Sequence, residues 1–504
     1  MRWNELTHEI ARQAGESISD PEITGIEYDS RRVRPGSVFV AMRGGTTDGN
    51  RYIEAAFHLG AAGIVTDSPE AFANLAEDHP ELPRLLVPHG RTGLAQVSAA
   101  FFNHPEKKLS ATGVTGTNGK TTTAFLVEAL LNAASRSTIL VGTIEHHVAG
   151  EIWPSEHTTP ESRDLFELMA DGVSRGATEL VMEVSSHALD QGRVAGIGFD
   201  VAVFTNLTRD HLDYHQTMEQ YFAAKQLLFD GTRYPAPRVA VLNLQDPHAG
   251  ELTHIAAQAG AEVVTYSLND SADWRAEDIR LTPAGAEFNL FAPRASTPVK
   301  SNLAGEVNVL NLLAALAAAH ARGIPFDTLT QAIPALKPVP GRFQPVHAGQ
   351  PFTVIVDYAH TDDALRNLTA LARKLVASNH GRVITLFGCG GDRDRTKRPK
   401  MGLAAGEESN FVVVTSDNPR SEDPMAIIQE ILPGLKPTGV PYIVEPDRAA
   451  AIALALSNAT RGDVVLLAGK GHEKEQILRG GTIFFDDVQV ALSALAKLGY
   501  GEAQ

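Results

Sequence analysis

The chain has 504 residues, of which 43% are hydrophobic and 21% are charged, a composition typical of a globular protein. This length exceeds what one ordinary hydrophobic core can organise, so we expect about two to four domains. The formal net charge of -16 argues against nonspecific nucleic-acid binding and requires any site for an anionic substrate to be locally basic.

Residues 1–106 have the pattern of a small α/β module. A helix is predicted at 52–59, and short apolar runs predict strands at 26–30, 38–42, 62–65 and 84–87. A polar, basic turn at 29–36 lies between two of these strands. It could bind a diphosphate, although such a turn is more often a solvated loop.

Residues 113–123, GVTGTNGKTTT, are the most informative stretch of the chain. A strand is predicted at 109–114 and a helix at 121–134. A glycine-rich turn between a strand and a helix can direct backbone N–H groups at a phosphate chain. Lys120 would then reach the outer phosphates, and the hydroxyl of Thr121 or Thr122 could bind Mg²⁺. The usual spacing has glycine where this chain has Val114, so a surface turn followed by a chance lysine is the alternative.

Strands are predicted next at 180–184 and 201–206. Ligands gather at the carboxyl ends of strands in open α/β sheets, so this edge should face the phosphates. The polar residues there are Glu183, Ser185, Ser186, His187 and Asn206. We interpret Glu183 as a Mg²⁺ ligand, with a structural ion-pair role as the alternative.

Two histidines, His211 and His215, lie four residues apart. The zinc-protease pattern needs Glu directly after the first histidine, where this chain has Leu212, so we reject that site. A hard ion with oxygen ligands and one imidazole fits better. Lys225 follows in a segment with helical spacing, and the residues alone favour an exposed helix lysine.

Asn308 and Asn311 open an Ala/Leu-rich helix and share one face of it. They could hydrogen-bond a nucleobase edge or cap the helix. Three prolines within 334–341 predict a stiff linker.

Beyond the linker, strands and helices alternate, which predicts a doubly wound third domain. Strands are expected at 352–356, 383–387, 411–415, 442–445 and 464–468, and helices near 364–377, 425–431 and 448–457. A Gly-x-Gly-x-x-Gly motif does not follow the first strand, so a dinucleotide site is not indicated.

Three loops are predicted at strand ends of this third domain. The loop at 388–400 carries Arg393, Arg395, Lys397, Arg398 and Lys400. A solvated charge run is the alternative, but the preceding Gly-Cys-Gly-Gly favours a shaped anion site. The loops at 416–420 and 469–473 add Arg420 and Glu473; Gly471 follows Lys470, so the latter is no second P-loop. Arginines bind carboxylates and a glutamate binds an ammonium, which together suit a zwitterionic amino acid.

The single cysteine, Cys389, excludes an internal disulfide and leaves no cysteine cluster for zinc. No apolar run approaches the ~18 residues of a membrane span, and residues 1–5 do not begin a signal peptide. We therefore expect a cytoplasmic protein without a membrane partner, and the acidic net charge argues against a nucleic-acid partner. Small-molecule substrates and a monomeric state are further expectations.

These motifs resemble the Mur ligases of peptidoglycan synthesis over essentially the whole chain. The GTNGKTT loop is family-wide and shared with folylpolyglutamate synthetases. The stretches EVSSHAL at 183–189, with Gln191 and Arg193, and DYAHT at 357–361 are similar to the ligases that add the third peptide residue. The sequence DNPR at 417–420 is similar to their meso-diaminopimelate-specific form.

The resemblance implies an α/β fold with three domains. Residues 1–106 would bind the UDP-linked substrate, 107–335 would form a central P-loop ATP-binding domain, and 336–504 would form a Rossmann-like amino-acid-binding domain. The implied activity is an ATP-dependent amide ligation through an acyl phosphate, with ATP and Mg²⁺ as cofactors.

The resemblance also implies site residues, position by position. Those expected to hold ATP are Gly116, Thr117, Asn118, Gly119, Lys120, Thr121, Thr122, Asn308, Arg342 and Asp357. Mg²⁺ would be held by Thr121, Glu183, His211 and Lys225, with Lys225 carbamylated by CO₂; Lys120, Glu183, His211 and Lys225 would be catalytic. The UDP-muramoyl dipeptide would contact Ser30, Thr158, Thr159, Ser185, Gln191 and Arg193. Diaminopimelate would contact Arg393, Asp417, Asn418, Arg420, Gly469 and Glu473.

Two positions depart from the family pattern. Asp362 stands where Pro commonly follows His-Thr, and Asn50 stands where His is common. Three alternatives remain at this point: a folylpolyglutamate synthetase or another Mur ligase, a regulator that uses the P-loop as a switch, and a catalytically dead scaffold.

Overall fold

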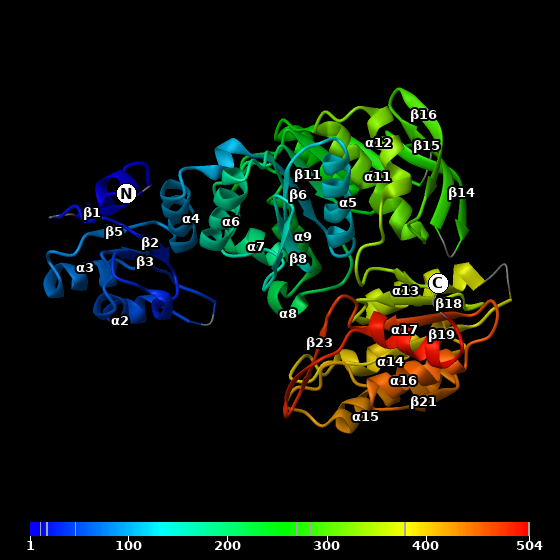
Figure 1. The fold of residues 1–504 in the computed structure, drawn as a ribbon. Coiled ribbons are helices and arrows are strands. Elements are labelled where there is room, and N and C mark those ends of the chain that lie inside the picture. Colours follow the sequence, from blue (N-terminus) through cyan, green and yellow to red (C-terminus); the bar gives the residue numbers. More distant parts are fainter. Residues whose placement is uncertain are drawn as a thin grey trace.

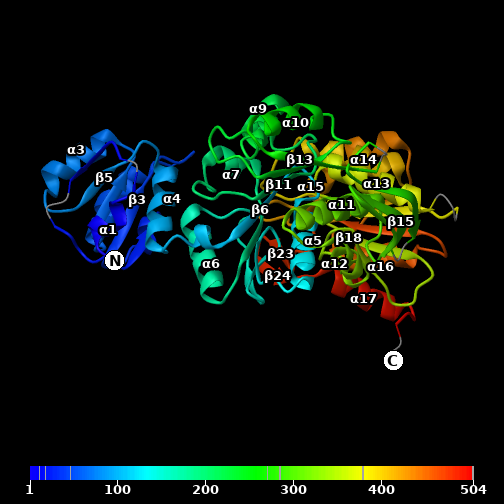
Figure 2. The same ribbon diagram turned by 90° about the horizontal axis from the view of Figure 1, so that it is seen from above.

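The computed structural model describes residues 1–10, 12–16, 19–45, 47–268, 271–282, 285–376 and 380–501. Over these residues the chain forms sheets of five, eleven, six and two strands, with helices against the three larger ones. The N-terminal sheet lies at one end of the molecule in both views (Figures 1 and 2), where α4 (Gly90–Phe101) faces α6 (Ser162–Ser174). The predicted α/β fold class is confirmed.

The N-terminal sheet has the order β1-β5-β4-β3-β2, parallel except for β1. Its strands are β1 (Ala14–Glu16), β2 (Gly25–Glu27), β3 (Ser37–Ala41), β4 (Gly63–Thr66) and β5 (Arg84–Leu86), and its helices are α1 (Trp3–Thr7), α2 (Ile53–His58), α3 (Pro69–Asp78) and α4. The strand predicted at 26–30 ends at Glu27, because Asp29 accepts a hydrogen bond from the Arg31 amide and caps a 3₁₀ turn, η1 (Ser30–Arg32).

The central sheet has a parallel core extended by antiparallel strands at both edges, in the order β16-β15-β14-β13-β12-β11-β6-β10-β7-β8-β9. Its strands are β6 (Ser110–Thr115), β7 (Thr138–Val141), β8 (Glu145–Val148), β9 (Glu151–Pro154), β10 (Glu179–Glu183), β11 (Val201–Phe204), β12 (Val239–Asn243), β13 (Glu262–Ser267), β14 (Trp274–Thr282), β15 (Gly285–Ala292) and β16 (Ala295–Ser301).

Helices cover both faces of this sheet. One hydrophobic cluster contains side chains of α5 (Lys120–Ala133), α11 (Glu306–Ala321) and α12 (Phe326–Ala332). A second cluster on the other face contains side chains of α4, α6, α7 (Ser186–Gln191), α9 (Met218–Gln226) and α10 (Ala249–Gln258). Because β10 and β11 flank β6 in parallel, their carboxyl ends meet at the turn between β6 and α5.

The C-terminal sheet has the order β17-β18-β22-β19-β20-β21, parallel except for β17. Its strands are β17 (Gln344–Val346), β18 (Thr353–Asp357), β19 (Val383–Phe387), β20 (Phe411–Val414), β21 (Tyr442–Val444) and β22 (Val464–Ala468). The helices are α13 (Asp362–Val376), α14 (Lys397–Glu408), α15 (Pro424–Leu435), α16 (Arg448–Ser457) and α17 (Asp487–Lys497). A hairpin of β23 (Glu475–Leu478) and β24 (Gly481–Phe484) follows β22.

One prediction in this part needs correction, and another extends beyond the described residues. The loop predicted at 388–400 becomes helix α14 at Lys397, so its last residues are helical. The helix predicted near 364–377 is α13, and Ala377 lies outside the described residues.

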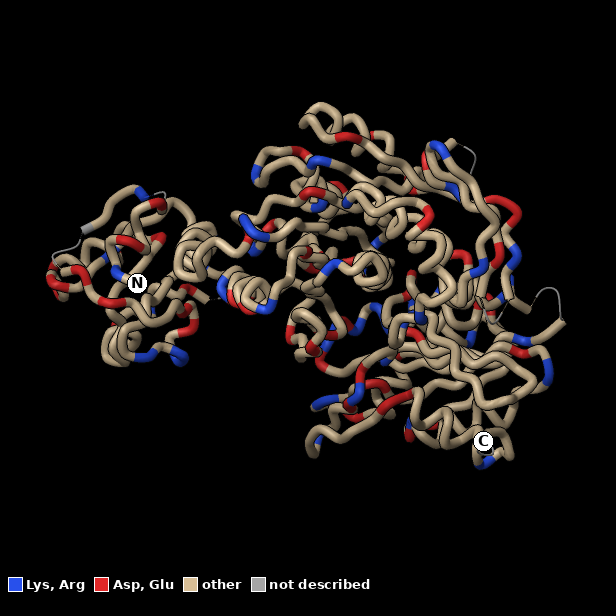
Figure 3. The backbone as a smooth tube through the Cα atoms, turned by 45° about the horizontal axis from the view of Figure 1, so that its top comes forward, with Lys and Arg blue, Asp and Glu red and all other residues tan. Residues whose placement is uncertain are grey.

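Acidic and basic residues are interspersed along the whole backbone (Figure 3), so the net charge of -16 is spread over the chain rather than gathered in one element. Among the described residues, none of the helices combines the length and hydropathy that a membrane span requires.

Candidate active site

The glycine-rich turn after β6 is held by the loop that follows β11. The backbone amides of Thr117 and Asn118 donate to the carbonyl and side-chain oxygens of Asn206, at 2.8 and 2.9 Å. Gly116 has a φ of +145°, and a Cβ there would lie 1.9 Å from the Thr205 hydroxyl. Glycine is therefore required at this position, and the turn is a fixed cradle rather than a free surface loop.

Two lysines meet at this turn. Lys120 Nζ donates to the carbonyls of Gly116 and Thr117, at 3.0 and 2.9 Å, and Lys225 Nζ donates to the same Gly116 carbonyl at 2.8 Å. Lys225 is 1% exposed. Burial, reinforced by the charge of Lys120, lowers the pKa of Lys225 well below its ordinary value. The interpretation of Lys225 as an exposed helix lysine is wrong.

Glu183 lies at the carboxyl end of β10 and is 1% exposed. One carboxylate oxygen accepts from the Thr121 hydroxyl at 2.8 Å, and the other accepts from the Thr143 amide at 2.7 Å. Arg342, from the segment before β17, donates to the same Thr121 hydroxyl at 3.3 Å. The candidate metal ligands Thr121 and Glu183 are therefore in direct contact, and Arg342 joins them.

His211 is the residue before helix α8 (Leu212–His215) and has a left-handed backbone, with a φ of 54°. Its ring packs against His187, with centroids 4.8 Å apart, and burial lowers the pKa of His211 to about 4. His215 instead contacts the Ser186 hydroxyl at 2.9 Å. Both histidine rings also lie against the rings of His187 and Tyr221, so the two histidines belong to one aromatic cluster.

No group of three or more His, Cys, Asp or Glu side chains that could hold a metal ion occurs in the part of the chain that the structure describes. Of the four predicted metal ligands, Glu183 and His211 belong to these residue types, whereas Thr121 and Lys225 do not. A metal at this position would therefore need oxygen atoms from elsewhere, such as phosphates or a modified lysine.

A cleft of about 500 Å³ lies between the central and C-terminal sheets, beside the glycine-rich turn. Its lining includes six of the predicted ATP residues: Asn118, Gly119, Thr122, Asn308, Arg342 and Asp357. The apolar side chains of Leu310, Phe343, Leu368 and Leu371 complete it. The Asp357 carboxylate accepts from the amides of Phe343 and Ala359, at 2.7 and 2.8 Å, and burial raises its pKa. A planar, partly apolar group fits such a cleft.

The predicted dipeptide residues form a hydrogen-bonded network at the end of β10. Thr159 donates its hydroxyl to the Glu183 carbonyl at 2.8 Å and accepts from the Ser185 amide at 3.1 Å. Arg193 donates to the Thr159 carbonyl and to Gln191, at 3.0 Å each, and Thr158 meets Thr143 at 3.0 Å.

Ser30 lies apart from this network, on η1 of the N-terminal sheet. The two regions approach each other where the Tyr28 hydroxyl donates to Asp164 of α6 at 2.6 Å. The structure therefore places Ser30 on the N-terminal part that faces the network, without a direct contact among the described residues.

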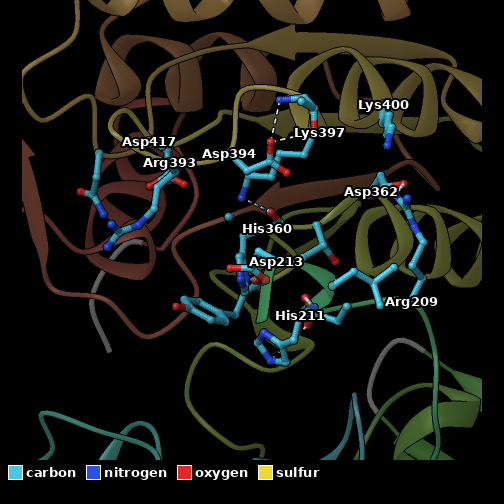
Figure 4. A pocket seen from close by; sticks show the side chains of 18 of the residues that line it. Arg209, His211, Asp213, His360, Asp362, Arg393, Asp394, Lys397, Lys400 and Asp417 are labelled. Carbon is cyan, nitrogen blue, oxygen red and sulfur yellow. Dashed lines mark hydrogen bonds and ion pairs between the residues drawn. The ribbon is translucent and has the colours of Figure 1, made fainter. Parts of the chain in front are cut away.

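A second cavity, of about 700 Å³, joins the central and C-terminal parts (Figure 4). Arg209, Asp210 and His211 contribute from the central part. From the C-terminal part, the lining includes all six residues predicted to bind an amino acid: Arg393, Asp417, Asn418, Arg420, Gly469 and Glu473. The cavity thus brings the amino-acid residues next to the histidine beside the glycine-rich turn.

Family models match three ranges of the chain. Residues 22–102 match "Mur ligase family, catalytic domain", residues 114–319 match "Mur ligase middle domain", and residues 341–471 match "Mur ligase, glutamate ligase domain". The chain belongs to the Mur ligase family.

Individual relatives extend this result. A protein of Solibacter usitatus (strain Ellin6076), named UDP-N-acetylmuramoyl-L-alanyl-D-glutamate--2,6-diaminopimelate ligase, is 48% identical over 98% of both chains. A solved structure described by the same name has 35% identity and a TM-score of 0.70, with 99% of each chain covered. A MurF ligase from Thermotoga maritima in complex with ADP is 20% identical, with a TM-score of 0.61 over 94% of this chain and 97% of that one. The last similarity shows the fold alone.

The predicted basic loop divides in this Mur ligase. Arg393, Lys397 and Lys400 line the larger cavity. Arg398 is fully buried and pairs with Glu422 at 2.7 Å and with Glu430 at 2.8 Å, and Arg395 also pairs with Glu430. The anion site expected in this loop therefore does not include Arg395 and Arg398, because their side chains pair with carboxylates on α15 and in the segment just before it.

Both departures from the family pattern have partners. Asp362 forms an ion pair with Arg209 of the central part at 3.0 Å. Asn50 accepts from the Thr66 hydroxyl at 2.6 Å and donates to Asp48 and Asp67, at 2.8 and 3.1 Å. Sequence reasoning also missed Thr143, whose backbone contact with Glu183 leaves no signal in its residue type.

Proposed function

We propose that this chain is an ATP-dependent amide ligase that adds meso-diaminopimelate to UDP-N-acetylmuramoyl-L-alanyl-D-glutamate in peptidoglycan precursor synthesis. One observation carries the proposal: a single cavity of about 700 Å³ joins His211 to all six candidate amino-acid residues. The relative from Solibacter usitatus, 48% identical over 98% of the chain, has this activity in its name.

Each part of the chain takes one substrate. Residues 1–106, together with the network at the end of β10, bind the UDP-muramoyl dipeptide; residues 107–335 bind ATP; residues 336–504 bind diaminopimelate. The sheets support these boundaries, because the strands of each of the three large sheets fall within one of the ranges.

The reaction must activate a carboxylate, because a carboxylate does not acylate an amine in water. A carboxylate oxygen of the dipeptide attacks the γ-phosphorus of ATP, and ADP leaves. The amine of diaminopimelate then attacks the acyl carbon, loses a proton and expels phosphate. Charge builds on several oxygens, so catalysis consists mainly of positioning and cationic stabilisation. Lys120, beside the carbonyls of the glycine-rich turn, supplies one of these cations.

Mg²⁺ fits the site at Thr121 and Glu183, where a hydroxyl and a carboxylate oxygen are 2.8 Å apart. His211 and a carbamate on Lys225 would complete the ligand set. When bound, Mg²⁺ supplies charge neutralisation at the phosphates, and it is commonly held by one or two carboxylates together with substrate phosphates. The lowered pKa of Lys225 supports the carbamate, since CO₂ reacts with a neutral amine and releases one proton.

The nucleotide base takes the cleft of about 500 Å³, where Asn308 and Asp357 offer polar groups beside apolar walls. The phosphates lie along Gly116 to Thr122, and Arg342 reaches them from the C-terminal part. Thr158, Thr159, Ser185, Gln191 and Arg193 hold the peptide end of the acceptor, and Ser30 holds its UDP end.

Diaminopimelate binds through Arg393, Asp417, Asn418, Arg420, Gly469 and Glu473. Diaminopimelate and lysine differ by one distal carboxylate, which we assign to Arg420. Lysine would leave the guanidinium without its anionic partner, a loss that supports discrimination of about 10⁴. We further propose that the enzyme acts as a monomer in the cytoplasm.

Phosphate release from ATP tests the function. Reactions contain the UDP-muramoyl dipeptide and either meso-diaminopimelate, lysine, glutamate or no amino acid. We expect release only with meso-diaminopimelate, and none from a Lys120→Ala variant. Release with glutamate would favour the folylpolyglutamate type of ligase, and release without any amino acid would indicate an ATPase.

A further inference from the structure

Lys470 is a fully buried lysine beneath the amino-acid end of the larger cavity. It lies in the loop after β22, between Gly469 and Gly471, which both have left-handed φ values, +113° and +53°. Its Nζ lies 3.1 Å from Asn418 Oδ1, 3.1 Å from Glu473 Oε2 and 3.9 Å from Asp417 Oδ1. Three of the six candidate diaminopimelate residues thus meet one buried side chain.

These contacts fix the side chain of Asn418. Its Oδ1 accepts from Lys470 Nζ and from the Ile477 amide, at 3.1 and 3.0 Å. With both acceptor positions occupied, Nδ2 points the other way and donates to Glu473 Oε2 at 2.8 Å. The orientation of the Asn418 amide therefore depends on Lys470.

The same contacts give the two carboxylate oxygens of Glu473 different hydrogen-bond partners. Oε2 accepts from both Lys470 and Asn418. Among the described residues, hydrogen bonds engage Oε2 of this carboxylate and leave Oε1 for a ligand. Lys470 thus holds Oε2 of Glu473 in place, which leaves Oε1 in a fixed position for a ligand. The positive charge of Lys470 also offsets one of the two carboxylates that a substrate ammonium would meet.

The surroundings of Lys470 are rigid. Arg448 and Asp487, both fully buried, form an ion pair at 2.6 Å, and Arg448 also donates to the carbonyls of Ser416 and Ala468. Those carbonyls directly precede the loops that carry Asp417 and Gly469. Gln476 of β23 donates to the Asp417 carbonyl at 2.8 Å. Because these neighbours are held by contacts of their own, a substitution of Lys470 should change mainly the contacts that Lys470 itself makes.

We propose that Lys470 is a positioning residue for the amino-acid substrate. It orients Asn418 and Glu473, so that the substrate ammonium finds a preformed acceptor. This inference rests on the proposed function, since it assigns the site to an amino acid that enters from the cavity. Preorganisation of this kind lowers the cost of binding and acts on one substrate only.

The first test separates the three substrates. In Lys470→Met, we expect the KM for meso-diaminopimelate to rise about 10- to 100-fold, the range for losing a charged hydrogen bond. The KM values for ATP and for the UDP-muramoyl dipeptide should stay within about twofold, because Lys470 contacts neither site. Lys474→Met removes an exposed lysine of the same loop and should leave all three KM values unchanged. An unchanged KM for meso-diaminopimelate, or equal rises in all three, would overturn the proposal.

The second test is a double-mutant cycle with Glu473→Gln. If Lys470 acts through Glu473, adding Lys470→Met to Glu473→Gln should raise the KM by no more than about threefold, far less than in the wild-type background. Independent, additive effects would overturn the proposal, because they indicate general damage to the domain. If Lys470→Met does not fold by circular dichroism, Lys470→Gln replaces it. Because this variant keeps a donor for Asn418 and removes the charge beside Glu473, we expect a rise in KM of about 10-fold, the lower end of the range, and again no more than about threefold in the Glu473→Gln background.

Failure of the proposed function gives a different result. If the wild-type enzyme releases phosphate only with another amino acid, the substrate assignment is wrong, and the KM for that amino acid takes the place of the KM for meso-diaminopimelate in both tests.

Discussion

Two buried lysines lie in different parts of the candidate site, one beside the glycine-rich turn and one beneath the candidate amino-acid residues. The charged groups around them have opposite signs. Lys225 is 1% exposed and meets the Gly116 carbonyl and the ring of Tyr221, with Lys120 nearby. Lys470 is fully buried and meets Asn418 and two carboxylates, those of Asp417 and Glu473.

This difference teaches that burial alone does not decide what a lysine does. Burial and a neighbouring cation lower the pKa of a lysine amine, and the neutral amine is the form that can react. Beside carboxylates, the same side chain holds its neighbours in place. We therefore propose that the lysine beside the glycine-rich turn takes part in the chemistry and that the lysine beneath the candidate amino-acid site holds its neighbours in position.

The largest expected effect follows from removing the reactive lysine. Lys225→Ala should lower kcat by about 10²–10³-fold, the scale for losing a charged group that stabilises a transition state. Short carboxylates such as formate or acetate should partly restore activity, because they supply the missing oxygens in the space left by the side chain. Steady-state phosphate release with and without the added acid measures this.

The control for this experiment is the wild-type enzyme with the same acids, which should not respond. Full activity of Lys225→Ala without added acid would remove the carbamate from the mechanism. It would also contradict the proposal that Lys225 takes part in the chemistry while Lys470 only positions its neighbours.

The next largest effect concerns the arginine beside the structural lysine. Arg420 has a left-handed backbone with a φ of 52°, and its amide donates to the Ile477 carbonyl at 2.9 Å. Arg420→Ala should raise the KM for meso-diaminopimelate about 100-fold or more, the scale for truncating one partner of a buried charge pair, and leave ATP binding intact. Arg479→Ala, an exposed arginine on the neighbouring hairpin, is the matched control. An unchanged KM in Arg420→Ala would contradict the assignment of Arg420.

Much of the fold could be predicted from hydrophobic patterns. Strands β19 and β22 and helix α16 have the bounds that the sequence indicated, because each is a short apolar run or an amphipathic helix between turn residues. Strands β14, β15 and β16, at one side of the central sheet, were missed. They alternate buried and exposed residues in a polar context, a pattern that a surface loop can also show.

The contacts of these two lysines show which part of the candidate site could not be predicted from the sequence. Lys225 contacts Gly116, 109 residues away in sequence, and Lys470 contacts Asn418, 52 residues away. No local pattern carries such a contact, so residue spacing alone favoured an exposed Lys225 and left Lys470 without a role. The resemblance to Mur ligases supplied the importance of Lys225, but the motif that contains Lys470 gave no hint of its burial.

A direct probe can tell the two lysines apart. With ¹³CO₂, the wild-type protein should give one carbamate signal by ¹³C NMR, lost in Lys225→Met and kept in Lys470→Met. The lowered pKa of Lys225 keeps its amine neutral at pH values that protonate an ordinary lysine, of pKa about 10.4. The signal should therefore persist at pH values below the ordinary lysine pKa and disappear as the pH falls below the lowered pKa of Lys225.

The same shift has a consequence for stability. Without CO₂, the unfolded chain binds a proton at Lys225 that the folded chain does not, so stability rises with pH between the lowered pKa and the ordinary value. Thermal unfolding across this range should show a steeper rise in the wild-type protein than in Lys225→Met. Parallel curves would contradict the burial of a neutral amine.

The smallest effect is expected where charge is exposed rather than buried. Arg209 and Asp362 pair at 3.0 Å across the larger cavity, but their side chains are 49% and 18% exposed. Asp362→Pro, which restores the common family residue, should change stability by about 0.2–1 kcal/mol and kcat/KM by less than about threefold, with the difference shrinking at high salt. Arg209→Ala should behave in the same way, because each change removes the same pair. If Arg209→Ala alone lowers kcat/KM by more than about tenfold, Arg209 contacts a substrate in the cavity, and its exposed position does not predict its contribution.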